Sequence, residues 1–144
     1  MANEDTVKLL KECNAGIKMG ISSIEKVLDS VEDKRFKSIL TRSLDENNCL
    51  GKKTAEALDR AGEEGKEPSS MAKSMAWVKT NTMLAMETSD ATIADLLTDG
   101  CHMGIKSINR YMNQYQNAED YAKDIANKII EIEENLAQDI RVYL

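Results

Sequence analysis

One six-residue pattern occurs twice in this chain, first as Cys13-Asn14-Ala15-Gly16-Ile17-Lys18 and again, 88 positions later, as Cys101-His102-Met103-Gly104-Ile105-Lys106. Each copy lies in a long segment whose apolar residues recur every three or four positions, the spacing typical of an amphipathic helix. A short turn and a second amphipathic segment follow each copy. The repeat therefore predicts two related helical hairpins that pack about a pseudo-twofold axis.

Helix start and stop signals divide the chain into four long helices. The first is expected over residues 5–29, and the second begins after the capping-type sequence of residues 30–33. Gly62 and Pro68 are the expected signals for the end of the second helix. The third and fourth helices are expected to begin at the polar caps of residues 88–90 and 117–120, and nothing in the chain is typical of a strand.

A shorter helix is expected over residues 69–87, where it would carry the chain back along the bundle. One domain, 1–144, would then contain a hairpin (1–65), a crossover (66–88) and a second hairpin (89–144). A four-helix bundle with one long crossover has ferritin-like connectivity. The predicted fold is all-α: a ferritin-like four-helix bundle with a short helix in the crossover between the second and third long helices.

Composition restricts the classes of partner and the cellular location. The net charge of −6 argues against nucleic acid, because phosphate binding needs a basic face. No apolar run is long enough to cross a bilayer, and the polar N-terminus does not resemble a signal peptide. Three widely spaced cysteines do not make a disulfide framework, so we expect reduced thiols and a cytoplasmic protein.

The chain resembles the ferritin-like superfamily and, more closely, an uncharacterised rubrerythrin-related family of four-helix bundles. The resemblance rests on residues 13–16 and 101–104, on Trp77-Val78-Lys79 in the crossover, and on the acidic helix start at residues 90–93. It covers nearly the whole chain and implies the fold. It implies no activity, because the biochemical role of that family is unassigned.

The sequence cannot supply the ligands of a di-iron centre. In this fold such a site takes a Glu from each of two helices and a Glu-x-x-His motif from each of the other two. The only histidine is His102, which is expected to be an ordinary exposed residue on the polar side of its helix. A metal ion bound here is therefore expected to be zinc or copper(I) rather than di-iron.

Two registers between the hairpins give different candidate ligands. An offset of 88 pairs Glu46 with Glu134 and makes Cys49 part of a Glu-x-x-Cys motif, although Cys49 and Glu134 then point away from the apolar arcs of their helices. An offset of 86 aligns the apolar residues of the second and fourth helices better. The candidate metal ligands are Cys13, Cys101, Glu46, Cys49, Glu133 and Glu134.

Each of the strongest candidates also has a purely structural interpretation. Cys13 and Cys101 lie on apolar stripes beside glycines, and such cysteines commonly act as small hydrophobic residues where helices approach closely. Glu133 lies inside an apolar arc and would be unfavourable there without a partner. Lys18, Asn47 or Lys106 is favoured over a metal as that partner.

Two functions from different classes follow. The favoured one is a ferritin-like bundle that lacks a complete di-iron set and acts as a non-enzymatic binding or structural protein. It is expected to form an oligomer, with a dimer as the first expectation, and to bind neither nucleic acid nor membrane. The alternative is a metal-binding or thiol-redox protein whose site at the bundle centre consists of Cys and Glu residues.

Overall fold

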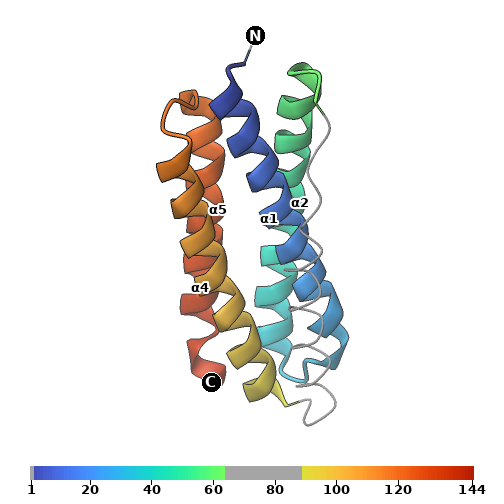
Figure 1. The fold of residues 1–144 in the computed structure, drawn as a ribbon. Coiled ribbons are helices and arrows are strands. Elements are labelled where there is room, and N and C mark those ends of the chain that lie inside the picture. Colours follow the sequence, from blue (N-terminus) through green and yellow to red (C-terminus); the bar gives the residue numbers. More distant parts are fainter. Residues whose placement is uncertain (1, 64–88) are drawn as a thin grey trace.

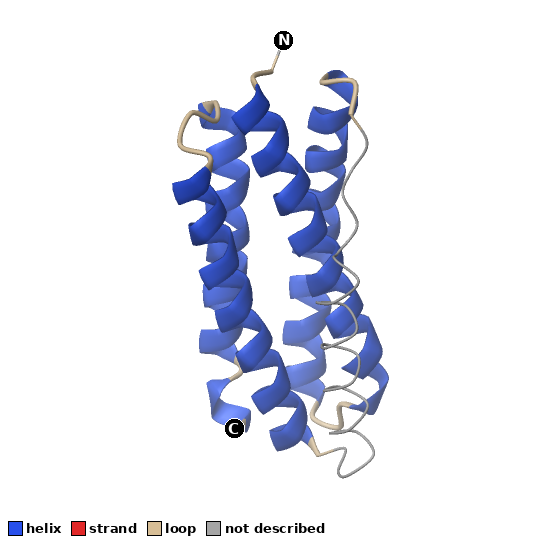
Figure 2. Ribbon diagram, in the orientation of Figure 1, coloured by secondary structure: helices blue, strands red, loops and turns tan. Residues whose placement is uncertain are grey.

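The computed structural model describes residues 2–63 and 89–144, which form an all-α four-helix bundle (Figures 1 and 2). The long helices are α1 (Glu4–Val27), α2 (Lys34–Arg60), α4 (Asp90–Gln114) and α5 (Asp120–Asp139), with 3-10 turns at Leu28–Ser30 and Arg141–Tyr143. The prediction of four long helices is confirmed. The predicted crossover helix, residues 69–87, lies outside the described residues. In the two described stretches, no helix has the length and apolarity that crossing a membrane requires.

Side-chain caps explain where the helices begin. Asn3 Oδ1 accepts a hydrogen bond from Thr6 N at 2.8 Å, and Asp33 Oδ1 accepts one from Phe36 N at the same distance. Such caps satisfy backbone N–H groups that have no partner within the helix. At the end of α2, Gly62 adopts a φ of +74°, and Glu63 N donates to Leu58 O at 3.0 Å. This left-handed glycine stop agrees with the prediction.

Contacts at the two ends of the bundle define the topology. At one end, Glu119 N donates to Thr6 Oγ1 at 2.8 Å, and Lys11 Nζ lies 3.1 Å from Glu63 Oε2. At the other end, the Asp90 carboxylate accepts hydrogen bonds from the backbone N–H groups of Glu32 and Asp33, both at 2.9 Å. Thus α2 ends at the end where α1 begins, whereas α4 begins at the opposite end (Figure 1). The helices α2 and α4 therefore run in the same direction, each antiparallel to α1 and α5.

The core consists of two apolar clusters, one toward each end of the bundle. The first cluster contains Leu9, Leu10, Cys13, Ile17, Leu50, Ala57, Leu58, Ile108, Ala118, Ala122, Ala126, Ile129 and Ile132. The second contains Ile24, Val27, Val31, Phe36, Leu40, Ile93, Ala94, Leu97, Cys101, Leu136 and Ile140. The two copies of the repeated pattern thus place one cysteine in each cluster, as a pseudo-twofold axis across the bundle would.

Candidate functional site

A polar layer separates the two apolar clusters at the middle of the bundle. On each long helix, first-cluster and second-cluster residues occupy different stretches, and small or polar residues lie between them. These intervening residues, which we call the polar layer, are Gly20 on α1, Ser43 and Asn47 on α2, Gly104 on α4 and Glu133 on α5. All four helices therefore contribute to this layer.

The Glu133 carboxyl lies between the backbones of two other helices. A Cβ atom added to Gly20 would lie 3.6 Å from Glu133 Oε1 and 3.6 Å from Asn47 Oδ1. A Cβ atom added to Gly104 would lie 3.7 Å from both the carboxyl carbon and Oε2 of Glu133. Although Glu133 as a whole residue is only partly buried, its carboxyl group is enclosed by α1 and α4. The two glycines leave the space that this carboxyl occupies.

Among the described residues, Cys101 is the titratable side chain close enough to this carboxyl to influence its pKa. Burial raises the pKa of the Glu133 carboxyl to about 7, and the nearby Cys101 thiol partly offsets this effect. Burial, followed by the nearby Glu133 charge, raises the pKa of the Cys101 thiol well above its ordinary value. The thiol is thus held protonated and unreactive, because the thiolate is the nucleophile and metal ligand.

The α2 side of the layer supplies polar groups without charge. Asn47 is buried, and its Nδ2 donates to Ser43 O at 2.9 Å, which leaves Oδ1 facing Gly20. Ser43 is also buried, and its Oγ has no hydrogen-bond partner among residues 2–63 and 89–144. Such an orphan hydroxyl is unusual, because buried polar atoms nearly always have a partner.

Of the six candidate metal ligands, the structure brings Cys101 and Glu133 together. Cys13 is buried in the first cluster, away from this pair. Both cysteines lie in the core, so their predicted position on apolar stripes is confirmed. The remaining three candidates lie nearer the surface: Cys49 and Glu134 are exposed, and Glu46 is partly exposed.

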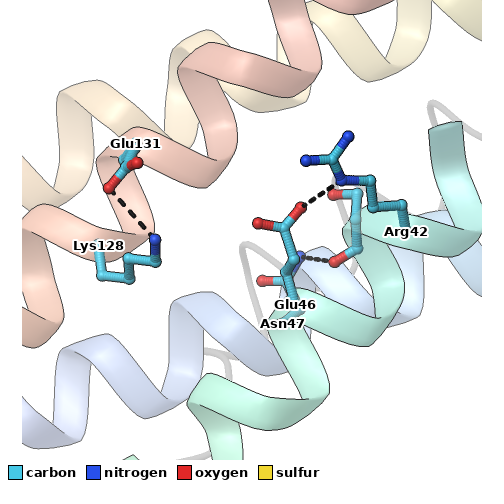
Figure 3. A network of polar contacts seen from close by, with 6 residues as sticks. Arg42, Glu46, Asn47, Lys128 and Glu131 are labelled. Atoms are coloured by element: carbon cyan, nitrogen blue, oxygen red, sulfur yellow. Dashed lines mark hydrogen bonds and ion pairs between the residues drawn. The ribbon is translucent and has the colours of Figure 1, made fainter.

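Glu46 and Cys49 belong to a groove on the outer side of the α2–α5 pair, with a volume of about 580 Å³. Glu46 Oε1 lies 3.9 Å from Arg42 Nε on α2, and Lys128 Nζ lies 3.3 Å from Glu131 Oε2 on α5 (Figure 3). These exposed pairs contribute little stability.

Within the described part of the chain, no three His, Cys, Asp or Glu side chains are grouped closely enough to hold one metal ion. Metal binding therefore stays a prediction, with two of its six ligands adjacent.

The structure also settles the register between the hairpins. The helix α2 begins at Lys34 and α5 at Asp120, an offset of 86. The same offset matches buried positions of the two helices, such as Leu40 with Ala126 and Leu50 with Leu136. It also makes Asn47 the counterpart of Glu133, and both residues face the polar layer. The offset of 88, which paired Glu46 with Glu134, is wrong for these helices.

The sequence interpretation found part of this site. It placed Glu133 inside an apolar arc and named Asn47 among its possible neighbours, and the structure confirms both positions. Lys18 and Lys106, the other suggested neighbours, are exposed. His102 is exposed, as predicted. The roles of Gly20 and Ser43 were missed, and the signal for both was their position between the two apolar stretches of a helix.

No protein-family model matches this chain, and a search of curated proteins finds no significant match.

Proposed function

We propose that this protein is a ferritin-like bundle without di-iron chemistry and that it acts as a non-enzymatic binding or structural protein. The supporting observation is the composition of the polar layer, which offers Glu133, Asn47, Ser43, two glycines and the neighbouring Cys101 thiol. A di-iron centre uses carboxylates from all four helices and imidazoles from two. One carboxylate and a protonated thiol do not fit that centre.

The arrangement of the helices supports the ferritin-like part of this proposal. Antiparallel hairpins, with α2 and α4 running in the same direction, are what one long crossover produces. An up-down-up-down bundle would have α2 and α4 related by a short turn and running in opposite directions. The repeated pattern on α1 and α4 adds a pseudo-twofold relation between the hairpins.

Aerobic loading with ferrous iron tests the absence of di-iron chemistry. The rate of iron oxidation is measured optically for the wild-type protein, for Glu133→Gln and without protein. We expect the three rates to agree. Saturable oxidation that scales with wild-type protein and falls in Glu133→Gln would overturn the proposal.

A structural role implies a partner, and we propose a second copy of this chain. Several large apolar side chains are exposed at the surface, including Met103 at 64% and Val142 at 79% exposure. Exposed apolar groups of this size often mark association surfaces when they are contiguous. Sedimentation velocity over a range of concentrations is expected to show a dimer, and a concentration-independent monomer would contradict this.

A metal-binding or thiol-redox protein is the second candidate, favoured by the proximity of the Cys101 thiol to the Glu133 carboxyl. The two side chains would be the core of a zinc or copper(I) site once the thiol lost its proton. Elemental analysis of untagged protein tests this, with Cys101→Ser as the variant and Cys49→Ser as the matched exposed control. Metal that is retained in Cys49→Ser and lost in Cys101→Ser would support the site, and equal content in all three proteins would exclude it.

A further inference from the structure

We propose that the groove between α2 and α5 binds a small amphiphilic carboxylate, with the carboxylate between Lys53 and Lys128 and an apolar chain along the groove floor. This α2–α5 groove has a volume of about 580 Å³ and lies on the outer side of the two helices. The inference rests on the proposed binding role and gives it a ligand class. It places that ligand on the outer surface and not in the polar layer.

The floor of the α2–α5 groove is apolar. Its apolar side chains are Leu50, Ala57, Ile125 and Ile132. Tyr121, which is 43% exposed, adds an aromatic ring to the lining. Sites for small molecules typically have volumes of about 300–1,000 Å³ and a mostly apolar lining with a few polar groups. The groove has both properties, so the apolar part of a ligand would gain free energy by leaving water here.

The shape of the groove favours a narrow ligand over a partner helix. Its lining residues on α2 run from Glu46 to Arg60, which spans about 21 Å at 1.5 Å per residue. Dividing the volume of about 580 Å³ by this length gives a mean cross-section of roughly 30 Å². A helix with its side chains is about 10 Å across and would need roughly 80 Å². An extended apolar chain therefore fits the groove, whereas a helix does not.

Two lysines lie on opposite walls of the groove at nearly the same level. The levels of α2 and α5 can be matched at Asn47 and Glu133, because a Cβ atom on Gly20 would lie 3.6 Å from both side chains. Counted from there along the antiparallel helices, Lys53 is six residues away on α2 and Lys128 is five residues away on α5. Both line the groove, so one small anionic group could contact the two ammonium groups together.

The balance of charge in the groove favours an anionic ligand. Its charged side chains are three cations and two carboxylates: Lys53, Arg60, Lys128, Glu46 and Asp124. The lining thus carries a net positive charge in a chain whose net charge is −6. Complementary charge of this kind steers a ligand to its site and discriminates against ligands of the wrong sign.

The existing ion pairs leave the two lysines available to a ligand. Lys53 has no carboxylate within ion-pair distance in residues 2–63 and 89–144. Lys128 Nζ lies 3.3 Å from Glu131 Oε2, but both side chains are about half exposed, so this pair is weak and easily exchanged (Figure 3). Glu46, one of the two lining carboxylates, is paired with Arg42. A ligand carboxylate between the lysines would therefore offset the repulsion of two like charges.

Cys49 can report whether the groove is occupied, because it is exposed and lines the groove. Alkylation of Cys49 by iodoacetamide is followed by mass spectrometry at rising concentrations of decanoate, all below micelle formation. Decyltrimethylammonium, which has the same chain and the opposite charge, is the matched probe. The buried Cys13 and Cys101 are internal references for any change in the fold as a whole.

We expect decanoate to slow the labelling of Cys49 in a saturable way and to leave the labelling of Cys13 and Cys101 unchanged. Half protection by decyltrimethylammonium should need a concentration at least about fivefold higher, because this probe loses the attraction of the two lysines.

Two double variants test the position of the carboxylate. Lys53→Gln/Lys128→Gln should raise the concentration of decanoate for half protection about tenfold and remove most of the difference between the probes. Lys52→Gln/Lys106→Gln removes the same charge from exposed positions outside the groove lining and should behave like the wild type. Each protection is measured relative to the same variant without a probe, and circular dichroism shows that the variants fold.

Equal protection by the two probes, or equal effects of the two double variants, would overturn the proposal. So would a lack of protection by decanoate. Protection of Cys49 that grows with protein concentration in the absence of a probe would also overturn it, because a second copy of the chain would then cover the groove. None of these outcomes alters the expected rate of iron oxidation, so failure of this inference is distinguishable from failure of the proposed function.

Discussion

Two glycines one turn apart on α4 allow a sharp test of the polar layer. A Cβ atom on Gly100 would meet nothing within 4 Å among the described residues, whereas one on Gly104 would meet the Glu133 carboxyl. Alanine is favoured over glycine inside a helix by about 1 kcal/mol. Gly100→Ala should therefore raise the free energy of unfolding by about 1 kcal/mol at any pH.

Gly104→Ala should give the same gain only when Glu133 is protonated. The added Cβ would lie 3.7 Å from the carboxyl, an ordinary van der Waals distance, so no steric strain opposes it. The methyl group of Ala at position 104 would, however, make the surroundings of the Glu133 carboxylate less polar, which disfavours its charged form. A further rise of about one unit in the pKa of Glu133 would lower the free energy of unfolding by about 1.4 kcal/mol once the group is ionised. We expect a gain of about 1 kcal/mol at pH 5.5 and roughly none at pH 8.5.

Urea unfolding followed by circular dichroism at both pH values measures the two effects. Gly100→Ala is the matched control, because it makes the same chemical change on the solvent side of the same helix. If Gly104→Ala matched Gly100→Ala at both pH values, the carboxyl would not lie against Gly104. If it destabilised the protein at pH 5.5, the space between α4 and α5 would be smaller than the structure indicates.

Three further predictions follow from individual contacts. The wild-type free energy of unfolding should fall by about 2 kcal/mol from pH 5.5 to pH 8.5. Over much of this range the folded state keeps a proton on Glu133, because its pKa is raised, whereas the unfolded chain has already released that proton, so raising the pH favours unfolding. Urea unfolding of Glu133→Gln should lack this part of the fall, and an unchanged fall would assign it to other groups. Asp90→Ala should lower the free energy of unfolding by about 1 kcal/mol, since two backbone N–H groups of the α1–α2 turn lose their acceptor. Asp95→Ala, at an exposed position of the same helix, is the control, and equal effects of the two changes would contradict the role of Asp90. Cys49 is exposed and should react with a thiol reagent at nearly the rate of the unfolded chain, whereas the buried Cys13 should react only after the protein opens. Mass spectrometry of the labelled peptides measures both rates, and faster labelling of Cys13 than of Cys49 would contradict this prediction.

The sequence predicted the helices well because their signals are local. Capping residues and the glycine stop act within one turn, so the predicted start of the first helix, residue 5, lies one position from the observed Glu4. The predicted end at residue 29 falls in the 3-10 turn Leu28–Ser30. Burial of Cys13 and Cys101 also followed from local periodicity, because a helical stripe determines which side chains face inward.

Which residues meet at the bundle centre depended on information that no single helix contains. Periodicity gives the direction of a side chain but not its height relative to another helix, and positions one turn apart are nearly equivalent in direction. The repeated pattern gave an offset of 88 for α1 and α4, whereas α2 and α5 are related by 86. Carrying the first offset into the second pair added Glu134 to the candidates, although the apolar arc of that helix already favoured Glu133 as the inward-facing residue. Both Cys101 and Glu133 were candidates, but with two offsets in conflict the sequence did not show that these two would lie together.

The polar layer lowers the stability of the bundle, and this argues that it serves a purpose other than packing. An apolar residue at position 133 would avoid enclosing a carboxyl that has no ion-pair partner among the described residues, and replacing buried charges by apolar groups is often stabilising. Buried polar residues can fix the register of helices, and Asn47 and Ser43 could do so without any titratable group. Register alone therefore does not account for a carboxyl that changes charge near neutral pH. A carboxyl enclosed between two glycines, with no cation of the described residues among the causes of its raised pKa, instead makes the stability of the bundle depend on the proton concentration.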